Sequence, residues 1–138
     1  MITDFNELTE RWQAELGAEL SPPASTAAIQ NADAAQVLIP ESLKAFYDVS
    51  NGLSCNWFSI FPVEDASRVK QTWDGIVRNN QKYNNAPPGF VLFATLGEGN
   101  MAYIKLDDES IWFDEPEGLA QTDLTLAEFI QACLLDAQ

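Results

Sequence analysis

The sequence contains no histidine and only two cysteines, and both shortages limit the chemistry that it can support. Without histidine, the Ser-His and Cys-His pairs that activate most hydrolase nucleophiles cannot be built, and imidazole acid–base catalysis is excluded. Cys55 and Cys133 lie far apart with no CxxC spacing, so neither a zinc site nor a disulfide framework is indicated. We expect both cysteines to be packing residues, and we expect no metal or other cofactor.

Basic residues and long apolar runs are also scarce. Seven Lys and Arg face 21 Asp and Glu, which leaves a net charge of −14. Such a field repels nucleic acid and anionic membranes and attracts basic proteins. No segment approaches the ~18 apolar residues of a membrane span, and the N-terminus lacks the basic start and apolar run of a signal peptide. These features predict a cytoplasmic protein whose partner is another protein.

What the sequence does have is material for one hydrophobic core. Apolar residues make up 46% of its 138 residues and aromatic residues 11%. A chain of this length buries enough surface as one unit, whereas two halves would be marginal. We therefore expect a single domain over residues 1–138, with an N-terminal helix and tether over residues 1–28.

Helical spacing and capping residues predict the helices near the N-terminus. The first begins after a cap at Thr3 or Asp4, stops at Gly17, and has its apolar stripe at Phe5, Leu8, Trp12 and Leu16. A second, alanine-rich helix follows a cap at Ser25 or Thr26 and runs to about Ala35.

Three further segments have helical patterns. One opens with Pro40 in its first turn and is expected to stop at Asn51-Gly52, where glycine supplies the left-handed conformation. The stretch from Val63 to Tyr83 returns to helical spacing. The last helix follows Thr125, which forms a capping box with Glu128.

Strand patterns fill the middle of the sequence. Trp57–Phe61 is aromatic and prone to form a strand, and Phe90–Ala94 is a continuous apolar run that suits a central strand buried on both faces. Met101–Leu106 and Ser110–Phe113 are expected to pair as an antiparallel hairpin across Asp107-Asp108-Glu109. Because helices come first and strands cluster afterwards, the order favours an α+β fold with one mainly antiparallel sheet carrying packed helices.

In this order the segments resemble the SUKH superfamily, which includes the yeast cell-wall-assembly regulator (Smi/Knr-like) domain and many bacterial toxin-immunity proteins. The resemblance spans roughly residues 29–134. Its carriers are Leu38-Ile39-Pro40 before a helix ending in Asn51-Gly52, the WFSIF strand with its VEDASRV helix, and the PPGFVLFATLGEGNMAYIKL and LTLAEFI segments.

The resemblance implies a small α+β fold with helices on one curved sheet, and no catalytic motif. It also implies structural roles for Pro40, Gly52, Gly97 and Gly99. Bacterial members look like cytoplasmic antidotes that bind a cognate toxin, often a nuclease. Their partner-contacting residues vary with the toxin, so no binding residue is carried over.

Two patterns imitate catalytic motifs. Residues 97–102 satisfy GxGxxA, but MAYIKL reads as a strand, whereas a dinucleotide cradle must open a helix; Glu98 would also repel phosphate. Ser67 and Lys70 match SxxK, but the companion motifs of that enzyme class are absent. We interpret the first as a tight connection between strands and the second as a coincidence on a solvated helix.

The acidic residues concentrate between positions 107 and 117. If residues 110–113 form a strand at ~3.3 Å each, roughly 13 Å separate the two halves of this group, too far for shared metal ligation. The group is a solvated turn and loop, a partner-binding patch, or a cation or catalytic site, in decreasing order of expectation. The candidate partner-binding residues are Asp107, Asp108, Glu109, Asp114, Glu115 and Glu117.

The four tryptophans could belong to the core or serve as contacts for a partner. Trp12 and Trp73 lie on apolar helix stripes and are assigned to the core. Trp57 and Trp112 lie in strands beside loops, so either place is open to them, and we keep both as candidate partner-binding residues.

The sequence thus favours a non-catalytic domain that binds and neutralises a basic toxin. A regulatory or scaffold module of the cell-wall-assembly-regulator type is the alternative, because it would share the fold and have no toxin partner. An enzyme is the third hypothesis, and it would need a pocket that joins carboxylates with lysine or tyrosine.

Overall fold

The computed structural model describes residues 4–64, 75–97 and 99–138. Within these ranges the chain forms five α-helices and one seven-stranded sheet, so the predicted α+β class is confirmed. Every strand pairs with its neighbours in sequence, in the order β1 to β7, and all pairs are antiparallel. The strands are β1 Glu19–Leu20, β2 Leu53–Cys55, β3 Phe58–Ile60, β4 Phe90–Gly97, β5 Asn100–Lys105, β6 Ile111–Glu115 and β7 Gly118–Gln121.

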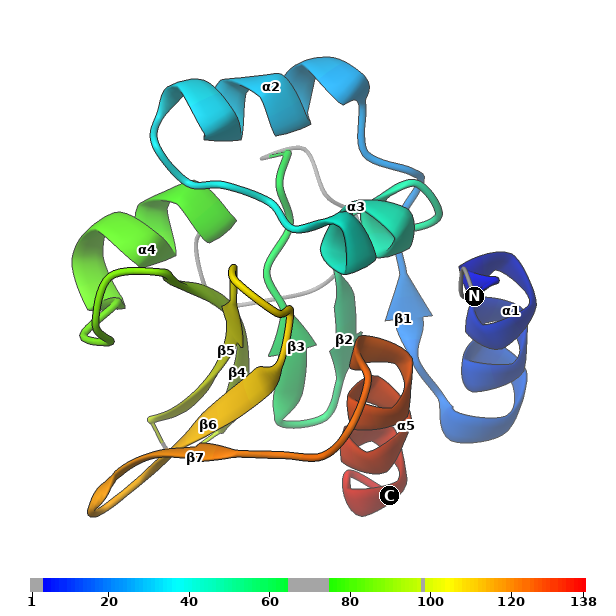
Figure 1. Cartoon of the computed structure of the whole chain (residues 1–138). Coiled ribbons are helices and arrows are strands. Elements are labelled where there is room, and N and C mark those ends of the chain that lie inside the picture. The colour runs from blue at the N-terminus through cyan, green and yellow to red at the C-terminus, as the bar shows by residue number, and fades with distance from the viewer. Residues whose placement is uncertain (1–3, 65–74, 98) are drawn as a thin grey trace.

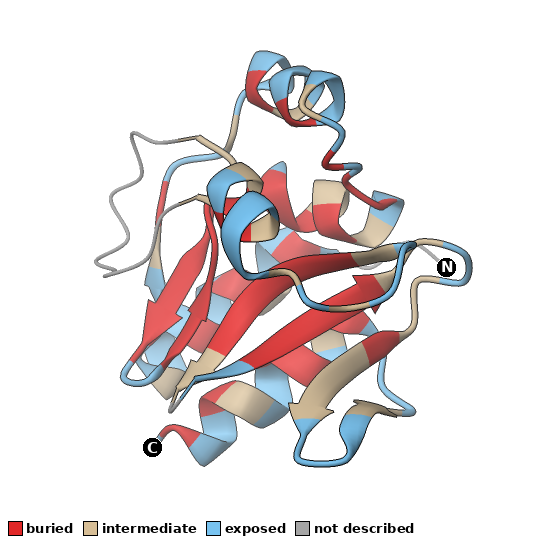
Figure 2. Ribbon diagram, turned by 90° about the vertical axis from the view of Figure 1, so that its left-hand side faces the viewer, coloured by how far each residue is buried: buried red, intermediate tan, exposed pale blue. Residues whose placement is uncertain are grey.

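The helices cover both faces of this sheet. Figures 1 and 2 show α4 on one face, with α1, α3 and α5 on the other and α2 beyond one end of the strands. Their bounds are α1 Phe5–Leu16, α2 Thr26–Ala34, α3 Glu41–Tyr47, α4 Ile76–Tyr83 and α5 Leu126–Asp136.

The core lies between the sheet and the helices, and β4 runs through its centre. Residues 91–95 of β4 are all buried, as expected for a strand covered on both faces, and Figure 2 shows the burial concentrated in the middle strands. Phe93 meets Phe129 of α5, with ring centroids 6.0 Å apart. Trp12 is buried on α1 as predicted, at a T-shaped angle to Phe5.

Local capping explains why three helices begin where the sequence predicts. The Asp4 side chain accepts hydrogen bonds from the first turn of α1, and Gly17 ends that helix in the left-handed region. Ser25 caps α2. Thr125 and Glu128 form the predicted capping box of α5, and the hydrogen bonds that Glu128 accepts lower the pKa of its carboxyl group.

Other boundaries differ from the predictions. Helix α3 ends at Tyr47, not at Asn51-Gly52, and Pro40 is its N-cap rather than a first-turn residue. Residues 48–51 instead form a turn, in which the amide N–H of Asn51 bonds to the Pro22 carbonyl, 2.9 Å away. This bond fixes the predicted tether against the end of α3.

Strands β1, β2 and β7 were not predicted, and Val63 does not begin a helix, because residues 61–64 are non-helical and α4 starts at Ile76. The VEDASRV helix, the SxxK pair at Ser67 and Lys70, Trp73 and Glu98 lie wholly or partly outside the described residues.

Gly52 does not act as the predicted helix cap, because α3 ends at Tyr47. Its φ of +106° lies in a region that side chains disfavour, and a Cβ atom there would sit 3.0 Å from the Ile60 carbonyl oxygen. Gly52 therefore permits both the turn and the close approach of β3.

We predict that Gly52→Ala lowers the free energy of unfolding by about 2 kcal/mol or more, since strain and a steric clash add. Gly17→Ala is the control, because φ there is +70° but a Cβ would meet nothing within 4 Å, so about 1 kcal/mol is expected. Urea denaturation measures both. Equal losses of unfolding free energy in the two variants would show that the Ile60 carbonyl moves away from the added Cβ atom without destabilising the fold.

Candidate functional site

The first acidic group, Asp107–Glu109, forms the predicted turn between β5 and β6. Asp107 and Asp108 are exposed. The Asp108 carboxylate accepts hydrogen bonds from the amide and the hydroxyl of Ser110, and these bonds lower the pKa of Asp108. The Ser110 hydroxyl in turn accepts a 2.7 Å bond from the Trp112 indole N–H. Asp108 thus helps to set the shape of its own turn.

Glu109 has a structural contact that the sequence did not reveal. Its Oε1 accepts a 2.8 Å hydrogen bond from the amide N–H of Ser42 in the first turn of α3. Pro40 offers that helix no side-chain cap, so Glu109 supplies an anion to the helix N-terminus from another element. Its backbone has φ +58°, in the left-handed region. The Glu109 carboxylate is therefore partly occupied by a hydrogen bond within the protein.

The second acidic group lies at the opposite end of β6. Asp114 and Glu115 are the last residues of that strand, and Glu117 lies in the turn before β7. The Asp114 carboxylate accepts a bond of 3.2 Å from the Met101 amide N–H, and partial burial raises the pKa of Asp114. Glu115 and Glu117 are exposed.

The structure does not bring the six acidic residues together as one patch. Strand β6 separates the two groups, in agreement with the spacing argument. Within the described ranges, no three Asp, Glu, Cys or His side chains are grouped closely enough to hold a metal ion. Of these six, Asp107, Glu115 and Glu117 are exposed, and their carboxylates accept no hydrogen bond from the part of the chain that the structure describes.

The two candidate tryptophans also lie apart. Trp57 is 40% exposed in the two-residue turn between β2 and β3, packed beside Gly97. Trp112 is half-buried in β6, edge-on to Phe90 with centroids 5.5 Å apart, and the Lys105 ammonium lies 6.0 Å from its ring centroid. Trp112 is thus held by neighbours, whereas Trp57 is available at the surface.

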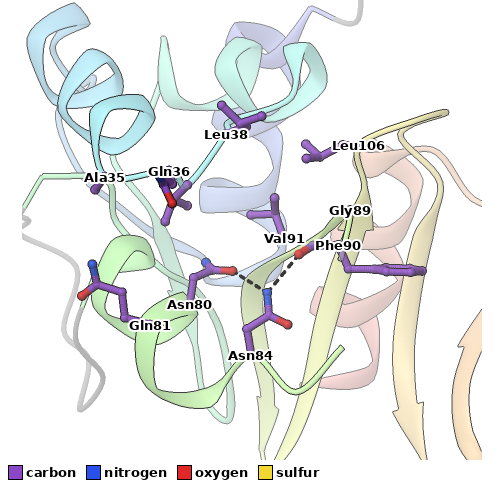
Figure 3. A pocket seen from close by; sticks show the side chains of 11 residues that line it. Ala35, Gln36, Leu38, Asn80, Gln81, Asn84, Gly89, Phe90, Val91 and Leu106 are labelled. Atoms are coloured by element: carbon purple, nitrogen blue, oxygen red, sulfur yellow. Dashed lines mark hydrogen bonds between the residues drawn. The ribbon is translucent and has the colours of Figure 1, made fainter. Parts of the chain in front are cut away.

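A pocket of about 320 Å³ opens where α4, β4 and the α2–α3 loop meet (Figure 3), and the sequence gave no sign of it. Its apolar wall includes Val91, Leu106 and Leu38, of which Leu38 is 47% exposed. The polar wall consists of amide side chains. None of its lining residues is ionisable; the others are Ala35, Gln36, Val37, Asn80, Gln81, Asn84, Gly89 and Phe90.

Two of these amide side chains hydrogen-bond to the main chain of β4, as a neighbouring strand would. The Asn80 side chain accepts a 2.9 Å bond from the Leu92 amide and donates a 2.8 Å bond to the Leu92 carbonyl. Asn84 donates bonds of 2.9 Å to the Phe90 carbonyl and 2.8 Å to Asn80, as drawn in Figure 3. Asn80 and Asn84 are therefore already hydrogen-bonded within the protein.

The patterns that imitate enzymes have structural explanations where they are described. Gly97 pairs with Asn100 across the β4–β5 turn and a strand follows, so no helix N-terminus is present for a dinucleotide. Cys55 and Cys133 are both free thiols. Burial raises the pKa of Cys55, and it raises the pKa of Cys133 to about 12, which suppresses the reactive thiolate.

The fold agrees with the comparison to known families. Residues 23–132 match the model of the SMI1 / KNR4 family (SUKH-1). The chain belongs to this family. The match covers most of the segment on which the resemblance rested, from the tether to α5. No curated protein matches the chain. None of the described helices of this SUKH-1 domain is long and apolar enough to cross a membrane.

We predict that Asn80→Ala lowers the free energy of unfolding by about 2 to 3 kcal/mol, because it leaves both peptide groups of Leu92 without their partner. Gln81→Ala, on the same helix but exposed, should change it by less than about 0.5 kcal/mol. Chemical denaturation gives both values, and hydrogen exchange at the Leu92 amide should accelerate in the first variant alone. Similar losses in both would contradict the role of Asn80.

Asp114 should make stability depend on pH. Because its pKa is raised in the folded state, its contribution to stability is present at low pH and is lost as pH rises through the folded pKa. We expect Asp114→Asn to raise the melting temperature above that of the wild type by more at pH 7 than at pH 3. Asp107→Asn makes the same charge change in an exposed turn and controls for net charge. An Asp114→Asn difference independent of pH would refute this prediction.

Proposed function

We propose that this domain is a non-catalytic immunity protein that binds and neutralises a cognate bacterial toxin in the cytoplasm. Membership of the SUKH-1 family supports the proposal, because that family includes toxin-immunity proteins. The observation that supports a basic partner is the net charge of −14, together with the exposed carboxylates in the turns at both ends of β6. Many bacterial toxins that act on nucleic acid must themselves be basic, since they bind polyanions.

The chemistry of the described surface supports a binding role over a catalytic one. The pocket has an amide and apolar lining, the two acidic groups lie apart, and both thiols are held protonated by burial. Trp57, which is 40% exposed, and Leu38 at the pocket mouth, which is 47% exposed, provide apolar contact area at the surface. Steering by charge followed by apolar contact is the usual sequence of events in such complexes.

The alternative is a regulatory or scaffold module of the cell-wall-assembly-regulator type. Genetic context separates the two, because an immunity gene should lie beside the gene of its toxin. We expect the purified product of that neighbouring gene to bind this domain and to lose its toxicity in cells that express both. A neighbouring toxin that neither binds nor is neutralised would reject the immunity role and favour the regulatory module.

Charge reversal at the free carboxylates tests how the partner is recruited. We predict that Asp107→Lys, Glu115→Lys and Glu117→Lys together slow association with the toxin by about tenfold or more at 0.05 M salt. The difference should shrink as salt screens the charges. Stopped-flow fluorescence measures the association rate.

The matched control reverses Glu7, Glu10 and Glu15, three exposed carboxylates of α1, and changes the net charge equally. It should slow association less. Equal effects of both triple variants would mean that net charge alone acts, and no effect of either would place the interface elsewhere.

A further inference from the structure

Strand β7 leaves one side of its backbone open at the edge of the sheet. In an antiparallel pair, the main-chain N–H and C=O groups of every second residue bond to the partner strand, and those of the residues between them point to the opposite side. The Thr122 amide bonds to the Ile111 carbonyl at 2.8 Å, so Ala120 and Gly118, in step with it, also face β6. Leu119 and Gln121 therefore direct their N–H and C=O groups outward, and no other described part of the chain bonds to them.

This edge has none of the usual features that block strand addition. Proteins protect edge strands with lysine, proline, bulges or extreme shortness. Residues 118–121 read Gly-Leu-Ala-Gln, with no charge and no proline, and they pair with β6 without a register shift. The other edge strand, β1, has only two residues. The protein thus presents one regular, uncharged edge of four residues.

Carboxylates flank this edge on both sides. Glu117 precedes β7 and Asp123 follows it, and both are exposed. If two copies paired through β7 about a twofold axis centred on Ala120, Glu117 of each would lie near Asp123 of the other, just beyond the ends of the paired strands. Like charges brought together across a strand pair destabilise it, so the edge disfavours a second copy. A partner strand with lysine or arginine facing Glu117 and Asp123 would be attracted to this edge instead.

We propose that the β7 edge receives an extended strand of a partner protein, uncharged over its middle and flanked by lysine or arginine. The inference rests on the proposed protein-binding function and specifies how the partner is held. Main-chain bonds to Leu119 and Gln121 fix the added strand, as in other β-augmentation complexes. Glu117 and Asp123 select its charge.

A synthetic strand tests the edge without knowledge of the natural partner. The probe is the peptide Lys-Thr-Val-Thr-Val-Thr-Lys, whose lysines are spaced to oppose Glu117 and Asp123, and its matched control has glutamate at both ends. In a titration followed by NMR, the lysine peptide should shift the Leu119 and Gln121 amide signals most, and it should bind at least about tenfold more tightly than the control. No shift at these two amides would overturn the proposal.

Two sets of variants separate the backbone from the charges. Gln121→Pro removes an outward N–H, which the ladder to β6 does not use, and should weaken the lysine peptide about fivefold or more. Gln121→Ala loses the same side chain but keeps the N–H, and should bind like the wild type. Equal affinity of these two variants would overturn the inference. If the proline variant unfolds, Glu117→Lys with Asp123→Lys decides, because it should reverse the preference between the peptides, and an unchanged preference would overturn the inference.

The outcome is distinct from that of the toxin experiment. Neutralisation of the toxin by the folded Gln121→Pro variant at wild-type potency would refute the edge inference and leave the immunity role intact. Sedimentation should show a monomer, and a dimer that Gln121→Pro abolishes would assign the edge to self-association instead. Peptide binding without any neutralisation would refute the toxin role alone.

Discussion

The central strand β4 is buried on both faces, and this burial depends on every peptide group along it having a partner. Strand β3 pairs with it only at Ala94 and Thr95, so the preceding residues would otherwise present bare amides and carbonyls inside the protein. The Asn80 side chain supplies both bonds to Leu92, as a neighbouring strand would. An unpaired buried peptide group costs about 1 to 3 kcal/mol, so the two hydrogen bonds from the Asn80 side chain avoid that loss at Leu92.

The family, the fold class and the best-capped helices could be predicted because their signals are local. Asp4, Gly17 and the Thr125 capping box act within one turn of the chain. The failures have the opposite cause. Strands β1, β2 and β7 have two to four residues, too few to show alternation, and they exist only because adjacent strands pair with them. Gly52 looked like a helix cap, yet what requires glycine there is its left-handed φ and the close approach of the distant Ile60 carbonyl.

The candidate site could be predicted only in part from the sequence, for a related reason. The acidic residues could be listed from the sequence, but their division into structural and free carboxylates depends on distant partners, such as Ser42 for Glu109 and Met101 for Asp114. The pocket draws on four separate segments, none of which has unusual composition. Only the fold shows that two of its amide side chains complete a strand.

The consecutive order of the strands also bears on how the chain is made. Each strand pairs with the one synthesised just before it, so most of the sheet can assemble through local contacts, which favours rapid folding. The two ends behave differently. Trp12 donates a hydrogen bond to Gln131, and the Gln138 side chain bonds to the Leu16 carbonyl, so part of the packing of α1 forms only when α5 and Gln138 are in place. Because these bonds join residues 119 and 122 positions apart, α1 is among the last elements of the domain to complete its packing.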